Sequence, residues 1–116
     1  MSGLMSYCAG QSAEAQVAAD FAARGYELRA ERWRGAAGEI DLILQQADEL
    51  VFVEVKKSRS FAAAAARISP AQQQRIMAAA QEYLACMPSG LDTPCRVDVA
   101  LVDSMGRIEI RENAFL

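Results

Sequence analysis

Two acidic residues and a lysine lie on consecutive apolar segments whose composition is typical of β-strands. Asp41 belongs to the first segment, and Glu54 and Lys56 belong to the second. A hairpin with a tight turn at Ala47-Asp48 would place Asp41 directly opposite Glu54, with Cβ atoms about 5 Å apart. Carboxylates this close repel each other unless a cation lies between them. The spacing therefore predicts a binding site for Mg²⁺ or Mn²⁺.

A lysine and a further acid extend this predicted site. Because alternate residues of a strand point the same way, Lys56 shares a face with Glu54. Its ammonium group can hold a metal-activated water and offset the charge that builds up during phosphoryl transfer. Glu14 shares the apolar face of a predicted helix with Val17 and Phe21. A carboxylate there is costly unless it is paired or metal-bound, although an acid in a first turn can equally complement the helix dipole.

Simpler interpretations of these residues stay open. The pattern formed by Glu54 and Lys56 also describes the polar end of a buried strand, or an ion pair across it. Asp41 is equally compatible with an outward position on an edge strand. The convergence of acids from three segments, together with a lysine, favours a functional site over coincidence.

The composition restricts the available chemistry. The 116 residues include no histidine, which excludes Ser-His-Asp catalysis, Cys-His catalysis and His-ligated zinc. Cys8, Cys86 and Cys95 form no C-x-x-C pair and leave an odd count, so neither a zinc ribbon nor a disulfide framework is expected. An enzyme with this sequence must use carboxylates, lysine, hydroxyl groups and a hard metal ion.

Length and hydropathy indicate an ordinary globular protein. With 116 residues, 53% of them hydrophobic, we expect a single domain over residues 1–116, in which residues 1–9 form a flexible N-terminal tail. No apolar run approaches the ~20 residues of a membrane span, and the N-terminal residues lack the features of a signal peptide. These observations predict a cytoplasmic protein that does not interact with a membrane.

Basic residues gather in the middle of the chain, although the formal net charge is −3. No acidic residue interrupts the segment that contains Lys56, Lys57, Arg59, Arg67 and Arg75. A run of like charges is usually a solvated face, so this segment alone is weak evidence for a polyanionic partner.

Periodicity and turn signals define the elements that would position these residues. Helices are predicted over Gln11–Arg24 and from Pro70, and strands over Tyr26–Glu31, Glu39–Leu44, Leu50–Lys56, Arg96–Val102 and Arg107–Arg111. The second helix opens on a capping box formed by Ser69 and Gln72. The alanine runs at 62–66 and 78–80 are interpreted as compositional bias. The order α-β-β-β-α-β-β predicts an α/β fold in which helices flank a mixed sheet.

Short motifs follow one another along nearly the whole chain. They are Gly10–Glu14, Gly25-Tyr26, Trp33-Arg34, Gly38–Ile43, Val51–Lys56, Arg96–Val99 and Asn113–Phe115. In this order the motifs resemble the small bacterial YraN family, which is placed by similarity among the PD-(D/E)xK nucleases, close to archaeal Holliday-junction resolvases. The resemblance implies a restriction-endonuclease-like core with the element order α-β-β-β-α-β.

The same resemblance implies a catalytic quartet. Asp41 and Glu54 would be the metal ligands, Lys56 would act on the water, and Glu14 would have a supporting role. The chain departs from the family pattern at Gln72, a position usually held by lysine. This departure affects substrate affinity more than the chemistry.

Our first functional hypothesis is a metal-dependent endonuclease that hydrolyses phosphodiester bonds in DNA, with branched or otherwise structured DNA as a candidate substrate. Contacts to phosphates would then come from Arg34, Lys57, Arg59, Arg67 and Arg75. Two cuts in a two-fold symmetric junction would call for a homodimer.

Two other classes of protein fit the same sequence. A nucleic-acid-binding accessory protein of nuclease fold is suggested by the net charge and by the small, uncharged Gly35–Ala37 loop. A protein-interaction module would carry the acids as a solvated face. Cleavage assays with Mg²⁺ separate the nuclease from the accessory protein, and metal titration identifies the interaction module.

Overall fold

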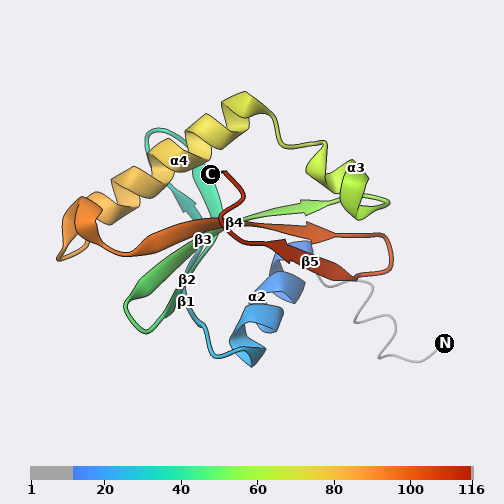
Figure 1. Cartoon of the computed structure of the whole chain (residues 1–116), viewed down its shortest axis with the longest axis horizontal. Helices are drawn as coiled ribbons and strands as arrows, with labels where there is room; N and C mark the ends of the chain where they lie inside the picture. The colour runs from blue at the N-terminus through green and yellow to red at the C-terminus, as the bar shows by residue number, and fades with distance from the viewer. Residues whose placement is uncertain (1–11, 116) are drawn as a thin grey trace.

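A five-stranded sheet forms the centre of the computed structural model, which describes residues 12–115 (Figure 1). The strands are β1 (Glu27–Arg34), β2 (Glu39–Gln46), β3 (Glu49–Lys57), β4 (Cys95–Val102) and β5 (Ile108–Arg111). The helices are α2 (Ala13–Ala23), α3 (Phe61–Ala65) and α4 (Pro70–Ala85), with a 3₁₀ turn, η1, at Gly90–Asp92. The predicted flexible tail, residues 1–9, lies outside the described residues.

The sheet is mixed because one of its connections crosses over. Neighbouring strands follow the chain order β1-β2-β3-β4-β5. The pairs β1–β2, β2–β3 and β4–β5 are antiparallel, whereas β3 and β4 are parallel and are connected through α3 and α4. Parallel neighbours need such a crossover, since a tight turn reverses the chain direction. The predicted α/β fold, with helices flanking a mixed sheet, is confirmed.

Both long helices begin at a serine cap, of which the sequence predicts the one at Ser69. The Ser12 hydroxyl accepts a hydrogen bond from the Ala15 amide at 3.1 Å, and the Ser69 hydroxyl accepts one from the Gln72 amide at 3.1 Å. Each bond satisfies an amide that has no partner within its helix. The chain leaves α2 through Gly25, whose φ of +91° lies in the left-handed region that glycine adopts without strain. Among residues 12–115, no helix is both long and apolar enough to cross a bilayer.

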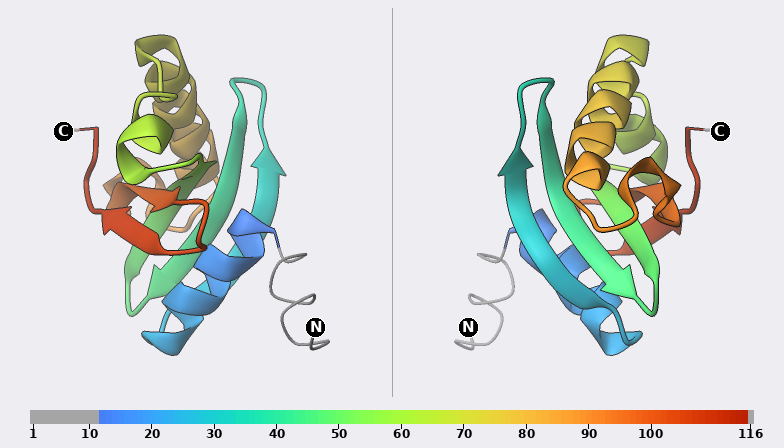
Figure 2. Two further views of the ribbon diagram at one scale, coloured as in Figure 1. Left: turned by 90° about the vertical axis from the view of Figure 1, so that its right-hand side faces the viewer. Right: turned by 90° about the vertical axis from the view of Figure 1, so that its left-hand side faces the viewer.

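The helices pack on opposite faces of the sheet (Figure 2). On one face, Val17 and Phe21 of α2 join the buried apolar residues of β2, β3 and β4. On the other face, Ile76, Ala80 and Leu84 of α4 cover a second set of apolar strand residues. α4 therefore turns an apolar face to the sheet, and the central strands are buried between two helical layers.

The central strand β3 carries the two candidate residues on its α4 side. Leu50 and Phe52 belong to the core under α4, whereas Val53 belongs to the core under α2. Because side chains alternate along a strand, Glu54 and Lys56 follow Phe52 on the α4 side. The fold thus directs an acid and a lysine toward the N-terminal half of α4.

The alanine run after β3 forms a helix that the sequence does not predict. The Ser60 hydroxyl caps α3 by accepting a hydrogen bond from the Ala63 amide at 3.0 Å. Buried Ala64 then joins Val99 and Leu101 of β4 in a small core. The sequence predicts no helix at residues 62–66, and this helix forms because a serine cap and high helix propensity combine with this packing.

The first strand is longer and less regular than its alternation predicts. β1 extends to Arg34, and its register against β2 shifts between Leu28 and Ala30. Arg32 adopts a φ of +49°, and Leu28 is 46% exposed. The predicted end of this strand at Glu31 is therefore wrong. The irregularities of this edge strand leave Leu28 exposed, although Ala30 and Trp33 pack against the core under α4.

Candidate metal and nucleic-acid site

The β2–β3 hairpin has the predicted register. Ile43 pairs with Phe52, and the turn consists of Ala47 and Asp48. This register brings the Asp41 side chain to the carboxyl group of Glu54, with which it forms a hydrogen bond. The hairpin therefore brings the two predicted metal ligands together.

The backbone ladder stops one residue short of Asp41. Pairing between β2 and β3 ends at Leu42 and Val53. Beyond this point, Asp41 Oδ2 accepts a hydrogen bond from the Val55 amide at 2.8 Å. The alternation of β2 is interrupted at the same place, because Ile40 packs under α4 whereas Leu42 packs under α2. The strands therefore part at Asp41, and its carboxylate replaces a carbonyl as the acceptor for β3.

A polar pocket of about 330 Å³ lies where the strands part and is closed on one side by α4. Its lining consists of Gly38, Glu39, Asp41, Glu54, Lys56, Gln72, Arg75 and Ile76. The acids and the lysine come from β2 and β3, and the last three residues come from α4. Three members of the predicted quartet, Asp41, Glu54 and Lys56, thus line one pocket.

The surroundings of Glu54 disfavour its charged form. The residue is 6% exposed, and its burial, its hydrogen bond with Asp41 and the Asp41 charge raise its pKa to about 9. Lys56 opposes this shift of the Glu54 pKa, whereas Glu39 adds to it. At neutral pH, Glu54 therefore keeps its proton. A divalent cation would replace that proton and remove the repulsion between the carboxylates.

The donor atoms of the pocket suit a hard cation that keeps water ligands. Within residues 12–115, no group of three or more Asp, Glu, Cys or His side chains is arranged to hold a metal ion. Mg²⁺ is usually bound by one or two carboxylates, with waters and substrate phosphates as its other ligands. Asp41 and Glu54 meet that requirement, and their oxygen ligands favour Mg²⁺ or Mn²⁺ over a softer metal.

Glu14 is not among the described residues that line this pocket. It lies half-buried in the first turn of α2, and α2 and α4 pack on opposite faces of the sheet. In the first turn its carboxylate complements the helix dipole. The structure thus leaves Glu14 outside the pocket that holds the other three candidates.

Two of the predicted phosphate-binding arginines flank the pocket. Arg75 on α4 lines the pocket itself. Arg34, at the end of β1, lies 3.1 Å from Glu39 in an ion pair and lines a hollow of about 300 Å³. This hollow adjoins the pocket, because Gly38 and Glu39 line both. A polyanionic strand in these hollows would therefore meet an arginine at either end.

The other predicted phosphate-binding residues follow the end of β3. Lys57 and Arg59 are exposed. Arg67 Nη1 donates a hydrogen bond to the Lys57 carbonyl at 2.6 Å. Arg67 therefore supports the connection after β3, in addition to its predicted role with nucleic acid.

Glu82 contributes to the neighbourhood of the site although no sequence motif contains it. Its carboxylate accepts hydrogen bonds from the amides of Ala36 at 2.9 Å and Ala37 at 2.7 Å. These contacts join segments separated by 46 and 45 residues. No pattern in the sequence identifies Glu82, because its partners lie on a distant hairpin.

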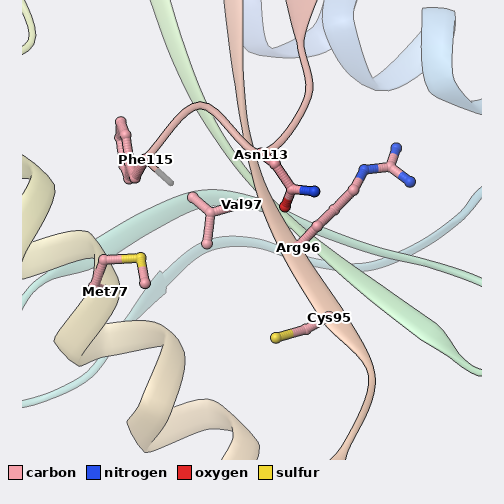
Figure 3. Close-up of a pocket in the computed structure, with 6 residues that line it drawn as sticks. All are labelled: Met77, Cys95, Arg96, Val97, Asn113 and Phe115. Carbon is pink, nitrogen blue, oxygen red and sulfur yellow. The ribbon is translucent and has the colours of Figure 1, made fainter.

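A smaller hollow lies between α4 and the C-terminal segment (Figure 3). Its volume is about 110 Å³, and Met77, Val97 and Phe115 contribute apolar lining. The Arg96 guanidinium group points away from these side chains. Burial raises the pKa of the Cys95 thiol, which keeps it protonated and poorly nucleophilic. The side chains of this hollow therefore contribute packing rather than catalytic chemistry.

Comparisons with known proteins support the family resemblance. The model of the uncharacterised protein family UPF0102 matches residues 13–102. A UPF0102 protein of Cereibacter sphaeroides is 56% identical over 115 residues, which cover 99% of this chain and 98% of the relative. UPF0102 proteins of Roseobacter denitrificans (54% identity, 97% of this chain and 87% of the relative) and Ruegeria pomeroyi (55%, 97% and 92%) are also similar. On the strength of these matches and of its motifs, the chain belongs to the UPF0102, or YraN, family.

Proposed function

We propose that this protein is a metal-dependent endonuclease with a PD-(D/E)xK-type core that hydrolyses phosphodiester bonds in DNA. The observation that carries the proposal is the pocket in which Asp41 and Glu54 share a hydrogen bond beside Lys56. Buried carboxyl groups are normally paired with a cation or with hydrogen-bond donors, whereas Glu54 has another acid as its partner. An arrangement that raises the pKa of a buried acid in a pocket is typical of functional sites.

Each residue of the pocket has a chemical role in this proposal. Asp41 and Glu54 hold Mg²⁺ or Mn²⁺, for which Glu54 gives up its proton. The cation, when bound, lowers the pKa of a water and stabilises charge on the phosphoryl oxygens. Lys56 donates a hydrogen bond to the attacking water and offsets the negative charge at the phosphoryl group. The water oxygen bonds to phosphorus as the bond to the 3′-oxygen breaks, the proton that the water loses passes to solvent, and the departing oxygen takes up a proton from solvent.

The basic residues around the pocket would hold the phosphates on either side of the cleaved bond. Arg34 and Arg75 flank the pocket, and Lys57 and Arg59 continue the basic surface after β3. Branched or otherwise structured DNA is the proposed substrate. A homodimer would provide two pockets for paired cuts in a symmetric junction.

A nucleic-acid-binding accessory protein of the same fold is the second candidate. The observation that favours it is that two of the predicted phosphate contacts already have partners inside the protein. Arg34 is paired with Glu39, and Arg67 donates to the Lys57 carbonyl. With a net charge of −3, these contacts leave fewer cations for the backbone of a nucleic acid.

A cleavage screen tests the proposed function. The substrates are four-way DNA junctions, flaps, single-stranded DNA and RNA, each incubated with Mg²⁺, with Mn²⁺ or with EDTA. We expect the wild-type protein to cut at least one DNA with a divalent cation and none with EDTA. Asp41→Ala and Glu54→Ala should abolish cleavage while melting like a folded protein, and Glu14→Ala should lose less activity, since Glu14 lies outside the pocket.

The outcomes separate the two candidates. Undiminished cleavage by either purified metal-ligand variant would refute the assignment of the site. Binding that weakens steeply with salt, without product from any substrate, would identify the accessory protein instead.

A further inference from the structure

The tip of the β1–β2 hairpin, residues 35–38, lies against α4 beside the pocket (Figure 2). Its sequence is Gly-Ala-Ala-Gly, so no side chain of the tip is larger than a methyl group. A Cβ built on Gly38 would lie 3.4 Å from the Cβ of Arg75. A Cβ built on Gly35 would lie 2.8 Å from the Glu82 carboxylate and from the Trp33 ring. Gly35 therefore leaves room for the Glu82 carboxylate and the Trp33 ring, and Gly38 lies within van der Waals distance of Arg75 on α4.

Glu82 fastens the tip to α4 with both of its carboxylate oxygens. Oε2 accepts a hydrogen bond from the Ala36 amide at 2.9 Å, and Oε1 accepts one from the Ala37 amide at 2.7 Å. The turn is closed by the Gly35 amide, which donates to the Gly38 carbonyl at 2.9 Å. Bonds from amides to an ionised carboxylate are stronger than bonds between neutral groups. Glu82 therefore fixes the position of the tip on the helix.

The position of the tip bears directly on the pocket. Arg75 and Glu82 are two helical turns apart, which places them on one face of α4. The tip spans this distance, with Gly38 at Arg75 and Gly35 at Glu82. Because Gly38 also lines the pocket, a shift of the tip along α4 would change the shape of the pocket and of the adjoining hollow.

We infer that Glu82 is a positioning residue whose bonds to the tip set the shape of the groove that a polynucleotide strand occupies. This inference rests on the proposed nuclease function. Glu82 acts through the tip and not on the reacting phosphate, and the strand it aligns passes between Arg34 and Arg75. Loss of Glu82 should therefore raise KM and weaken DNA binding while kcat stays nearly constant, because the metal ligands on β2 and β3 keep their places.

The test compares Glu82→Ala and Glu82→Gln with Gln81→Ala, a matched change at the exposed preceding position of α4. The affinity for a fluorescein-labelled four-way DNA junction is measured by anisotropy with Ca²⁺, and kcat and KM are measured with Mg²⁺. Thermal melting and amide hydrogen exchange at Ala36 and Ala37 report on the fold and on the tip.

We expect Glu82→Ala to raise both KM and Kd about tenfold while kcat changes less than about twofold. The amides of Ala36 and Ala37 should exchange faster in this variant. Glu82→Gln keeps one carbonyl acceptor, so its KM and Kd should lie between those of Glu82→Ala and the wild type. This variant also provides the test if the alanine variant does not fold. Gln81→Ala should behave like the wild type.

Three results would overturn the inference. The first is an unchanged KM and Kd in Glu82→Ala despite faster exchange at the tip, which leaves the proposed function intact. The second is a proportional loss of kcat and thermal stability that Glu82→Gln does not relieve, which indicates general destabilisation. The third is a wild-type protein that neither binds nor cleaves the junction, which refutes the proposed function as well.

Discussion

Two buried acids in neighbouring strands of the sheet have opposite surroundings. Asp98 on β4 is fully buried, and its carboxylate accepts bonds from Arg96 Nε at 3.0 and 3.1 Å and from the Asn113 amide at 3.1 Å. Burial raises the pKa of Asp98, but these bonds and the Arg96 charge oppose the shift. Glu54 on β3 is bonded to a second acid, Asp41, which adds to the effect of burial on its pKa.

The Asp98 cluster shows what a carboxylate contributes when the fold satisfies it. The Arg96 guanidinium also bonds to Glu49 at 3.0 Å and to the Tyr26 hydroxyl at 3.0 Å. One arginine therefore joins the beginning of β3, the segment before β1 and the neighbouring acid on β4. Such a buried network stabilises the packing of the strands as long as it is complete.

The two acids differ in whether the fold supplies a cation that balances their charge. The charge of Asp98 is balanced by a cation from the chain itself, so the cluster needs nothing from solution. The pair at Glu54 lacks an equivalent balance, although Lys56 reduces the repulsion. A buried acid that the fold does not balance is available to a cation from solution, which is the requirement for a metal site.

The largest expected effect comes from breaking the balanced cluster. Arg96→Ala leaves the Asp98 carboxylate buried without its cation, so the free energy of unfolding should fall by about 3–5 kcal/mol. Urea denaturation measures this change. Arg111→Ala is the control, because Arg111 pairs with Glu109 at 2.7 Å and both side chains are exposed, by 49% and 41%. It should lower the free energy of unfolding by about 1 kcal/mol or less, and equal losses in both variants would contradict the comparison.

The unbalanced pair should make the metal-free protein sensitive to pH. The folded protein keeps the Glu54 proton up to about pH 9, whereas the unfolded chain releases it near the ordinary value of 4.5. The folded state therefore binds more protons between these values, and the free energy of unfolding should fall as the pH rises through this range. Glu54→Gln should remove this dependence and keep the contribution of Asp98. The free energy of unfolding is measured against pH in EDTA for the wild type and for Glu54→Gln. Parallel curves for the two proteins would show that the pKa of Glu54 is not raised.

Added Mg²⁺ should stabilise the protein through the same pair. At a concentration one hundred times the Kd, binding to the folded state raises the free energy of unfolding by about 2.7 kcal/mol. Asp41→Asn and Glu54→Gln should lose this gain, and Glu109→Gln, a change in the exposed pair with Arg111, should keep it. Thermal melting with and without Mg²⁺ measures the effect. An equal shift of the melting temperature by Mg²⁺ in all variants would show that the ion binds away from Asp41 and Glu54.

The smallest expected effect concerns the basic residues around the pocket. Arg75→Ala should weaken DNA binding and reduce the slope of log K against log salt by about one, because one phosphate contact is lost. Arg24→Ala is the matched control, since Arg24 pairs with Asp20 on α2. Anisotropy titrations over a range of salt concentrations measure the slopes, and identical slopes would remove Arg75 from the interface.

The sequence predicts the parts of the site that depend on short-range geometry. A tight turn at Ala47-Asp48 and the alternation of strand side chains suffice to bring Asp41 to Glu54 and to place Lys56 on the same side. The helix cap at Ser69 follows from an equally local hydrogen bond. Each of these features needs information from fewer than about twenty residues of chain.

The parts that the sequence does not predict depend on contacts between distant segments. Ser60 and an alanine run become a helix because β4 offers a surface for Ala64. Glu14 satisfies the helical pattern of an inward-facing acid, yet α2 and α4 cover opposite faces of the sheet. Neither outcome follows from periodicity, because periodicity does not specify which face of the sheet a helix covers.

By itself, the sequence determined the order of the five strands and the two long helices, the hairpin that pairs two acids, and the absence of histidine chemistry. The tertiary structure decided that the strands part at Asp41, that α4 closes the pocket with Arg75, and that Glu82 holds the hairpin tip. The physical reason is the range of the interactions. Turns, caps and alternation are set by neighbouring residues, whereas burial and charge balance depend on which distant side chains the folded chain brings into contact.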